Sequence, residues 1–176
     1  MGALIVFESL FGNGRAVARA VATGLSSRMP VEVVAVEDAP TVFDPGLDLL
    51  VVGGPNHRFG LSSDSSRGEG AATSDTPVTV PGSGLREWLP QLAAAPGRTQ
   101  AAVYDTRLAN PRFLDWVDHA STSIVRHLRR AGFRMLAPAE HFYVSAGTGP
   151  LVEGEIECAQ AWGEGLAAQL PAAQRP

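Results

Sequence analysis

The sequence predicts an α/β domain: a doubly wound, five-stranded parallel sheet of order 2-1-3-4-5 with helices on both faces. Three observations predict it. Apolar runs of strand length alternate with stretches of helical period along the 176 residues. The runs are nearly continuous, as in strands that are buried on both faces. Five such runs occur with no sixth, which favours this strand order and one domain over 1–176.

Each element follows from its local pattern. Helix spacing is clearest after the first strand, where apolar residues stand at 17, 18, 21, 22 and 25. Pro90 interrupts the helix after the third strand, and Gly132 ends the next helix as a C-cap. The predicted strands are 3–8, 31–36, 47–53, 100–104 and 133–144. The predicted helices are 15–28, 84–94, 112–131 and 153–169.

One long segment, 55–83, has no convincing period and is rich in Ser, Gly, Thr, Asp and Pro. Loops this long inside a compact domain are usually functional or disordered. We expect 55–60 to be functional because it leaves the carboxyl end of a strand, where ligands bind in such sheets. We expect 68–81 to be a flexible loop and 171–176 to be a tail.

Composition excludes several functions. The net charge is −4 and the basic residues are scattered along the sequence, so we expect no nucleic-acid partner. The single Cys158 permits no intramolecular disulfide and is typical of a reducing compartment. With no leader-like start, no membrane-length apolar stretch and no Cys/His cluster, we expect a cytoplasmic protein without membrane or metal. All fourteen basic residues are arginine, which excludes a Walker P-loop and a Schiff-base lysine.

The turn between the first strand and the first helix is the strongest candidate site. A helix N-terminus presents unpaired amides, and Gly12 and Gly14 leave its approach open to an anion. Ser9 adds a hydroxyl, which favours a phosphate site. The alternative is a turn that needs its glycines for backbone geometry alone. Val17 breaks the dinucleotide pattern G-x-G-x-x-G, and no G-x-S-x-G elbow occurs. A receiver domain would need an aspartate where Gly53 stands.

Three segments carry a resemblance to a known family. "ESLFGNGRAVARAVATGL" resembles the phosphate loop and first helix of flavodoxins, and "LLVVGGPNHRFGL" resembles their third strand and first flavin-covering loop. "VYDTR" lies where their second covering loop leaves the fourth strand. The resemblance therefore implies a flavodoxin-like fold and non-covalently bound FMN. The implied cofactor-binding residues are Ser9, Leu10, Phe11, Gly12, Asn13, Gly14, Pro55, Asn56, His57, Arg58, Phe59, Gly60, Tyr104, Asp105, Thr106 and Arg107.

The resemblance also implies roles within this set. Residues 9–14 would wrap the phosphate, 55–60 would cover one edge and face of the ring, and 105–107 would line the other. His57 or Phe59 is the candidate for stacking on one ring face. Tyr104 is the candidate on the other face, with a place in the core as its alternative. The Phe59–Gly60 peptide would be the one that flips beside flavin N5. The family usually has threonine at the position of Gly14, so we expect Gly14→Thr to tighten FMN binding.

Two further expectations concern charge and function. Arg15, Arg58, Arg67 and Arg107 lie on or near the predicted rim, which favours a less negative flavin potential. The function implied is an electron-transfer protein that works between a reductase and an acceptor protein. The alternatives are an NAD(P)H-dependent flavodoxin-like reductase, and a flavodoxin fold that has lost FMN and acts as a binding or regulatory module.

Overall fold

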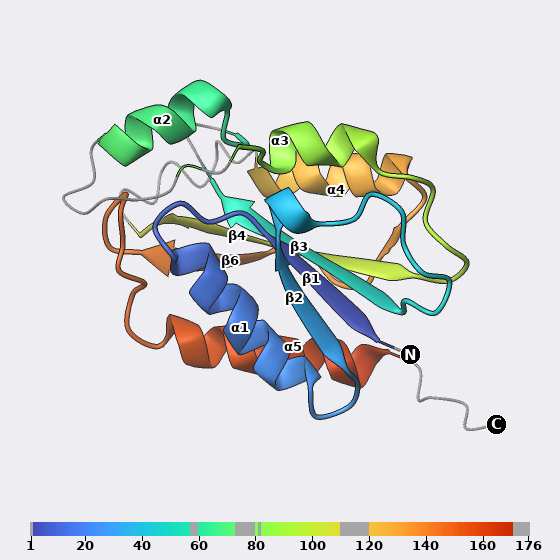
Figure 1. Ribbon diagram of the computed structural model, residues 1–176. Helices are drawn as coiled ribbons and strands as arrows, with labels where there is room; N and C mark the ends of the chain where they lie inside the picture. The colour runs from blue at the N-terminus through green and yellow to red at the C-terminus, as the bar shows by residue number, and fades with distance from the viewer. Residues whose placement is uncertain (1, 57–59, 73–79, 81, 110–119, 171–176) are drawn as a thin grey trace.

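The chain forms a parallel sheet between two layers of helices (Figure 1). The structure is a computed structural model that describes residues 2–56, 60–72, 80, 82–109 and 120–170. The strands are β1 (Ala3–Phe7), β2 (Val31–Ala35), β3 (Leu49–Pro55), β4 (Gln100–Leu108), β5 (Arg134–Met135) and β6 (Glu140–Val144). The helices are α1 (Asn13–Leu25), α2 (Asp64–Ala72), α3 (Leu85–Trp88), α4 (Ala120–Arg130) and α5 (Glu155–Gln169).

The sheet order is β2-β1-β3-β4-β5, with β6 also paired to β4, and every pairing between these six strands is parallel. This confirms the predicted order. The fifth position is divided: β5 pairs with the start of β4, at Gln100 and Ala101, and β6 pairs with its end, from Tyr104 to Leu108. The sequence indicated one strand region over 133–144. Pro138 lies in the gap and cannot donate to a ladder, which accounts for the division.

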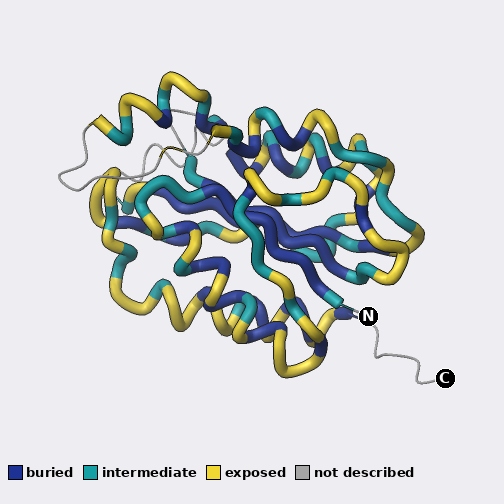
Figure 2. Tube along the Cα trace, viewed as in Figure 1, coloured by how far each residue is buried: buried dark blue, intermediate teal, exposed yellow. Residues whose placement is uncertain are grey.

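The strands alternate between two cores because successive side chains point to opposite faces. Ile5 and Val51 pack with α1 and α5 on one face, whereas Val6 and Val52 pack with α3 and α4 on the other. Figure 2 shows the central strands β1, β3 and β4 as the most continuously buried part of the molecule. The predicted doubly wound arrangement is therefore confirmed.

The contact between α1 and α5 is close because both helices carry glycine there. A Cβ on Gly163 would overlap the backbone of Val21, and a Cβ on Gly24 would overlap the backbone of Gln160. Both positions therefore exclude any side chain larger than hydrogen. This contact fixes α1, and with it the turn that precedes the helix.

The expectation for 68–81 is wrong at its start. Residues 68–72 belong to α2, which Figure 1 shows beyond the carboxyl ends of the strands, while 73–79 and 81 lie outside the described residues. Helical period was hard to see in "DSSRGEGAA" because Arg67 is its only buried residue. A Cβ on Gly70 would lie 2.9 Å from Leu10 Cδ2, so α2 packs on the turn before α1.

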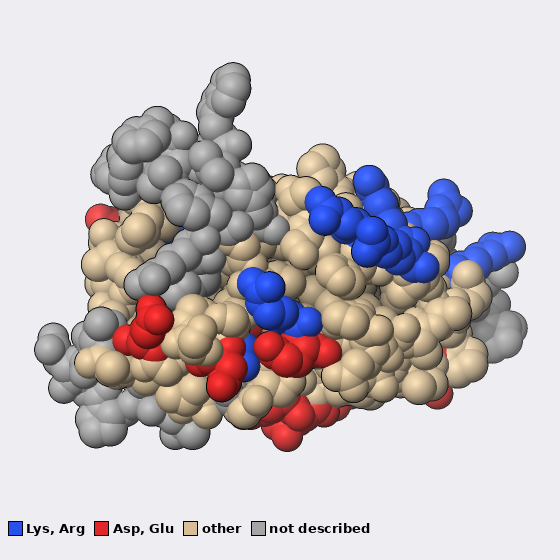
Figure 3. All heavy atoms as spheres, turned by 90° about the horizontal axis from the view of Figure 1, so that it is seen from above, with Lys and Arg blue, Asp and Glu red and all other residues tan. Residues whose placement is uncertain are grey.

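Helix α4 carries a group of basic side chains. Arg126, Arg129 and Arg130 lie three and four residues apart on α4 and share one face. Figure 3 shows arginine side chains grouped on this side of the molecule. The last two suit the carbonyl end of the helix dipole.

Candidate functional site

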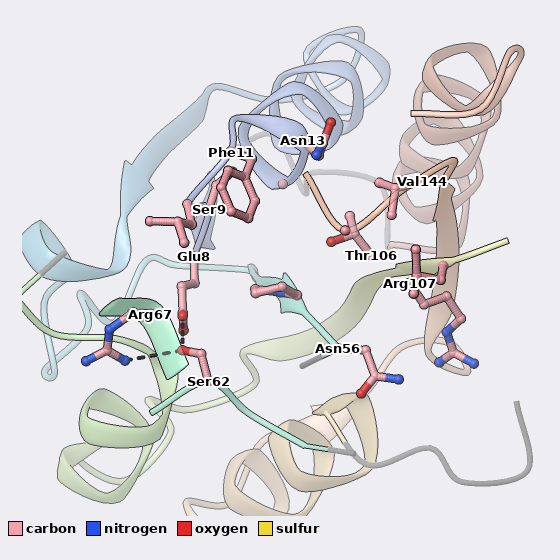
Figure 4. Close-up of a pocket in the computed structure, with 15 residues that line it drawn as sticks. Glu8, Ser9, Phe11, Asn13, Asn56, Ser62, Arg67, Thr106, Arg107 and Val144 are labelled. Atoms are coloured by element: carbon pink, nitrogen blue, oxygen red, sulfur yellow. Dashed lines mark hydrogen bonds between the residues drawn. The ribbon is translucent and has the colours of Figure 1, made fainter. Parts of the chain in front are cut away.

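A cavity of about 240 Å³ lies at the carboxyl ends of β1, β3, β4 and β6. In a doubly wound sheet this is where ligands bind, because the crossovers leave β1 and β3 in opposite directions. Apolar side chains form much of the wall, and Figure 4 shows polar side chains from separate elements around it. The apolar lining residues are Leu10, Phe11, Pro55, Leu108 and Val144.

The N-terminus of α1 opens onto this cavity. Gly12 is the N-cap residue and has φ 89°, a left-handed conformation that favours glycine. No side chain caps this end, and the first-turn amides of Asn13, Gly14 and Arg15 find no acceptor among the described residues. Such amides, at the positive end of the dipole, suit an anion.

Gly14 is glycine because strand and helix approach closely there. A Cβ at this position would lie 2.7 Å from the carbonyl oxygen of Glu8 and 3.3 Å from Ser9 Cβ. Contacts below 3.0 Å force the backbone to move, so a threonine would disturb the turn before its hydroxyl could help. The structure thus contradicts the reasoning behind the expected gain from Gly14→Thr.

Asn13 connects this turn to the segment after β6. Its Nδ2 donates to the carbonyl oxygen of Thr148 at 3.3 Å, and a Cβ on Gly149 would lie 2.6 Å from the same amide nitrogen. Gly149 has φ 100°, so the backbone there also needs glycine. This contact brings Gly147 and Val144 into the cavity wall.

A buried polar cluster forms the wall below the turn. Glu8 is 3% exposed, and its carboxylate accepts hydrogen bonds from Ser62 Oγ and, at 2.7 Å, from the backbone amide of Leu85. Arg67 is 2% exposed, and its Nη1 donates to Ser62 Oγ and to Glu87 Oε2, both at 3.2 Å. Figure 4 shows Glu8, Ser62 and Arg67 linked in this way. The cluster ties β1, α2 and α3 together.

A second polar cluster lies in the second half of β4 and at the start of β6. Arg107 Nε and Nη2 donate to the two carboxylate oxygens of Asp105 at 2.9 and 2.7 Å. His141 Nδ1 lies 3.1 Å from Asp105 Oδ1 and 2.7 Å from Arg107 Nη2. Burial raises the pKa of Asp105, but the hydrogen bonds and charges of His141 and Arg107 together outweigh burial and hold this pKa below its ordinary value.

Tyr104 does not lie at the cavity. Its side chain is fully buried, it packs against Phe142 and Trp162, and its ring fills the space above Gly53. The prediction that Tyr104 covers a flavin face is therefore wrong. Its position at the middle of a strand buried on both faces is the physical reason. The same burial raises the pKa of its hydroxyl, which stays protonated.

The structure brings most of the described predicted residues to one place. Those that line the cavity are Ser9, Leu10, Phe11, Asn13, Gly14, Pro55, Asn56, Thr106 and Arg107. Gly12, Gly60, Tyr104 and Asp105 are described but do not line it. His57, Arg58 and Phe59 lie outside the described residues. Of the rim arginines, Arg67 and Arg107 line the cavity, while Arg15 is exposed and lies over the ring of Phe7.

The sequence reasoning missed several lining residues. Glu8, Ser62, Leu108, Val144 and Gly147 were not proposed, and Arg67 was expected at the rim rather than in the wall. Two signals were available. Glu8 is a carboxylate at the end of an otherwise apolar strand, and Val144 ends the last strand at the same edge of the sheet.

No helix of the described residues combines the length and the apolar character needed to cross a membrane. Within the same residues, His, Cys, Asp and Glu side chains form no group of three or more that could hold a metal ion.

The same architecture occurs in known flavodoxins. A flavodoxin from Streptococcus pneumoniae TIGR4 superposes with TM-score 0.64 at 17% identity, over 97% of this chain and 100% of that one. Oxidised flavodoxin 2 from Bacillus cereus superposes with a TM-score of 0.63 at 12% identity, over 97% of this chain and 100% of that one. A flavodoxin from the domain Archaea superposes with a TM-score of 0.61 at 14% identity, over 96% of this chain and 98% of that one. No protein-family model and no curated protein matches the sequence. The chain therefore has the flavodoxin-like fold.

Proposed function

We propose that this protein is an FMN-binding electron-transfer protein that holds the flavin without a covalent bond at the carboxyl end of its sheet. The observation that carries the proposal is the uncapped N-terminus of α1 beside a largely apolar cavity. The amides suit a phosphate, and the apolar wall suits a flat ring system. Solved structures of the same fold include flavodoxins, which supports the choice of a flavin.

The residues present fit this cofactor. The glycine turn leaves open a cradle at the amides of Asn13 and Gly14, with Ser9 beside it. Pro55, Leu108 and Val144 offer apolar surface to a ring. When bound, FMN supplies the redox chemistry, because electrons enter and leave through its ring. The protein's share is to bind the phosphate, to orient the ring and to set the charge around it.

The direct test is a titration of the purified protein with FMN. We expect quenched flavin fluorescence, a shifted visible absorption band, and one site per chain. Protein that leaves both signals unchanged at high concentration contradicts the proposal and favours a fold that has lost its cofactor.

A second measurement addresses the reductase alternative. We propose that a separate reductase reduces the flavin, and that the reduced protein passes electrons to an acceptor protein in the cytoplasm. The loaded protein mixed with NADH or NADPH alone should therefore show no steady-state oxidation of the nucleotide. Steady turnover with a quinone in the absence of a reductase would replace the carrier role with an enzymatic one.

A further inference from the structure

Two buried side-chain atoms of the described residues lack a hydrogen-bond partner: Asn56 Oδ1 and Arg67 Nε. Both residues line the same cavity. A buried polar atom without a partner typically costs about 1–3 kcal/mol, and more if it is charged. Native structures hold few such atoms, and each calls for an explanation. Their occurrence together, at the candidate site, points to a ligand that supplies both partners.

Arg67 is held rigidly in the wall. Its Nη1 donates to Ser62 Oγ and Glu87 Oε2, and its Nη2 lies 3.8 Å from Asp64 Oδ1. A Cβ on Gly84 would overlap Nη1, so the guanidinium packs directly on the backbone there. Nε is thus a preorganised donor, because the hydrogen bonds of Nη1 and the packing on Gly84 hold the guanidinium in place.

Asn56 is fixed through its backbone. Its amide donates to the carbonyl oxygen of Thr106 at 2.8 Å, which extends the β3–β4 ladder by one residue. The side chain leaves from this anchored point, and Figure 4 shows Asn56 and Arg67 on opposite sides of the view. Oδ1 is an acceptor, so its partner must carry an N–H or O–H.

We propose that the ligand in this cavity accepts a hydrogen bond from Arg67 Nε and donates one to Asn56 Oδ1. The inference rests on the proposed function and adds a cationic side-chain contact that the phosphate loop itself does not provide. A flavin mononucleotide offers both kinds of group: phosphate and carbonyl oxygens accept, whereas ribityl hydroxyls and a ring N–H donate.

Arg67 is tested with a matched pair of variants. Arg67→Lys keeps a charge that can reach Ser62 or Glu87 but has no donor at the position of Nε. Arg86→Lys is the control, because Arg86 also binds this segment, at the carbonyls of Leu61 and Ser62, but does not line the cavity. We expect Arg67→Lys to weaken FMN binding about 10-fold or more, and Arg86→Lys by less than about 3-fold. Equal affinities in the two variants, with equal melting temperatures of the ligand-free proteins, overturn the Arg67 contact.

Asn56 is tested with riboflavin, which carries no phosphate, so that the negative charge of an aspartate variant does not repel the ligand. Asn56→Leu removes the acceptor at similar size, and Asn56→Asp keeps it. We expect about 3- to 10-fold weaker binding for the leucine variant and less than about 2-fold for the aspartate variant. Equal losses of riboflavin affinity in the two variants, or no loss in either, overturn the Asn56 contact. No loss is expected if only water binds to Asn56 Oδ1.

The proposed function can fail separately. Wild-type protein that binds neither FMN nor riboflavin contradicts that function, and inorganic phosphate then serves as the probe. A change in the NMR signal of the Arg67 Nε–H on phosphate addition, absent for the Arg86 Nε–H, supports the inference in that case. An unchanged Arg67 signal overturns it.

Discussion

The hydroxyl of Tyr104 donates a hydrogen bond to the carbonyl oxygen of Gly14 at 3.0 Å. One residue lies in the core of β4 and the other in the first turn of α1, so the bond connects the buried sheet to the candidate phosphate loop. The ring reaches this carbonyl because Gly53, which pairs with Tyr104 across the sheet, has no side chain in the way.

Tyr104→Phe should lower the free energy of unfolding by about 1 kcal/mol, because it removes one buried hydrogen bond and retains the packing of the ring. Urea denaturation followed by fluorescence measures this change. FMN affinity should fall by less than about 3-fold, since the hydroxyl contacts the loop and not the cavity. A loss of FMN binding with unchanged stability would return Tyr104 to the ligand site.

Gly14→Thr should destabilise the protein by about 1–3 kcal/mol and weaken FMN binding, because its Cβ would press on the carbonyl of Glu8. Denaturation and FMN titration give the two quantities. Gly165→Ala is the matched control: Gly165 lies on the exposed side of α5 with no atom within 4 Å of its Cβ position. The free energy of unfolding of that variant should rise by up to about 1 kcal/mol. Tighter FMN binding by Gly14→Thr would show that the turn has room and that the sequence-based expectation was right.

The pair formed by Asp105 and Arg107 should make stability depend on pH on the acid side. Because the folded pKa of Asp105 lies below its ordinary value of 3.8, folding favours the ionised carboxylate. Its stabilising contribution is fully present above about pH 4 and is lost as the pH falls through the folded pKa. Asp105→Asn should remove this part of the acid dependence. Because it removes the carboxylate that accepts two hydrogen bonds from Arg107, it should also lower the free energy of unfolding at pH 7 by about 1.5–3 kcal/mol.

Urea denaturation between pH 7 and pH 2.5 measures the effect. The free energies of wild type and Asp105→Asn should converge as the pH falls below 4. A constant difference between the two proteins over this range would show that Asp105 titrates alike in the folded and unfolded states.

The fold was predictable because its strands are continuous apolar runs and its helices have clear period. The division of the fifth strand was harder to foresee, since Pro138 could also have marked a turn after the strand. Helix α2 escaped prediction because it covers the loop before α1 mostly with small and polar residues, and only Arg67 is buried. Amphipathic pattern cannot reveal a helix whose buried residue is charged.

The site was predictable to the extent that topology determines it. Ser9, Asn13 and Asn56 follow strands, and Thr106 lies near the end of β4. These strands meet at one edge of the sheet, and the rule for switch points places the four residues together. Side-chain direction was not predictable in the same way. Tyr104 points into the core, and Glu8 is buried because Ser62 and the amide of Leu85 meet its charge, two partners that lie far along the chain.

Glu8 and Glu87 differ in burial, so removing their charges should change the free energy of unfolding by different amounts. Glu8 and Glu87 both belong to the cluster around Arg67, but Glu8 is 3% exposed and Glu87 has 38% of its side chain exposed. Glu8→Leu leaves the Ser62 hydroxyl and the Leu85 amide without an acceptor, and it should cost about 3–5 kcal/mol.

Glu87→Gln should cost less than about 1 kcal/mol, because its pair with Arg67 is partly hydrated and glutamine can still accept from the amide of Gly84, as Glu87 does at 2.8 Å. Urea denaturation of both variants at pH 7 tests the difference, and limited proteolysis should cut only Glu8→Leu faster between β3 and α3. Similar small losses in the two variants would mean that water reaches Glu8, and that the cavity wall is looser than its hydrogen bonds indicate.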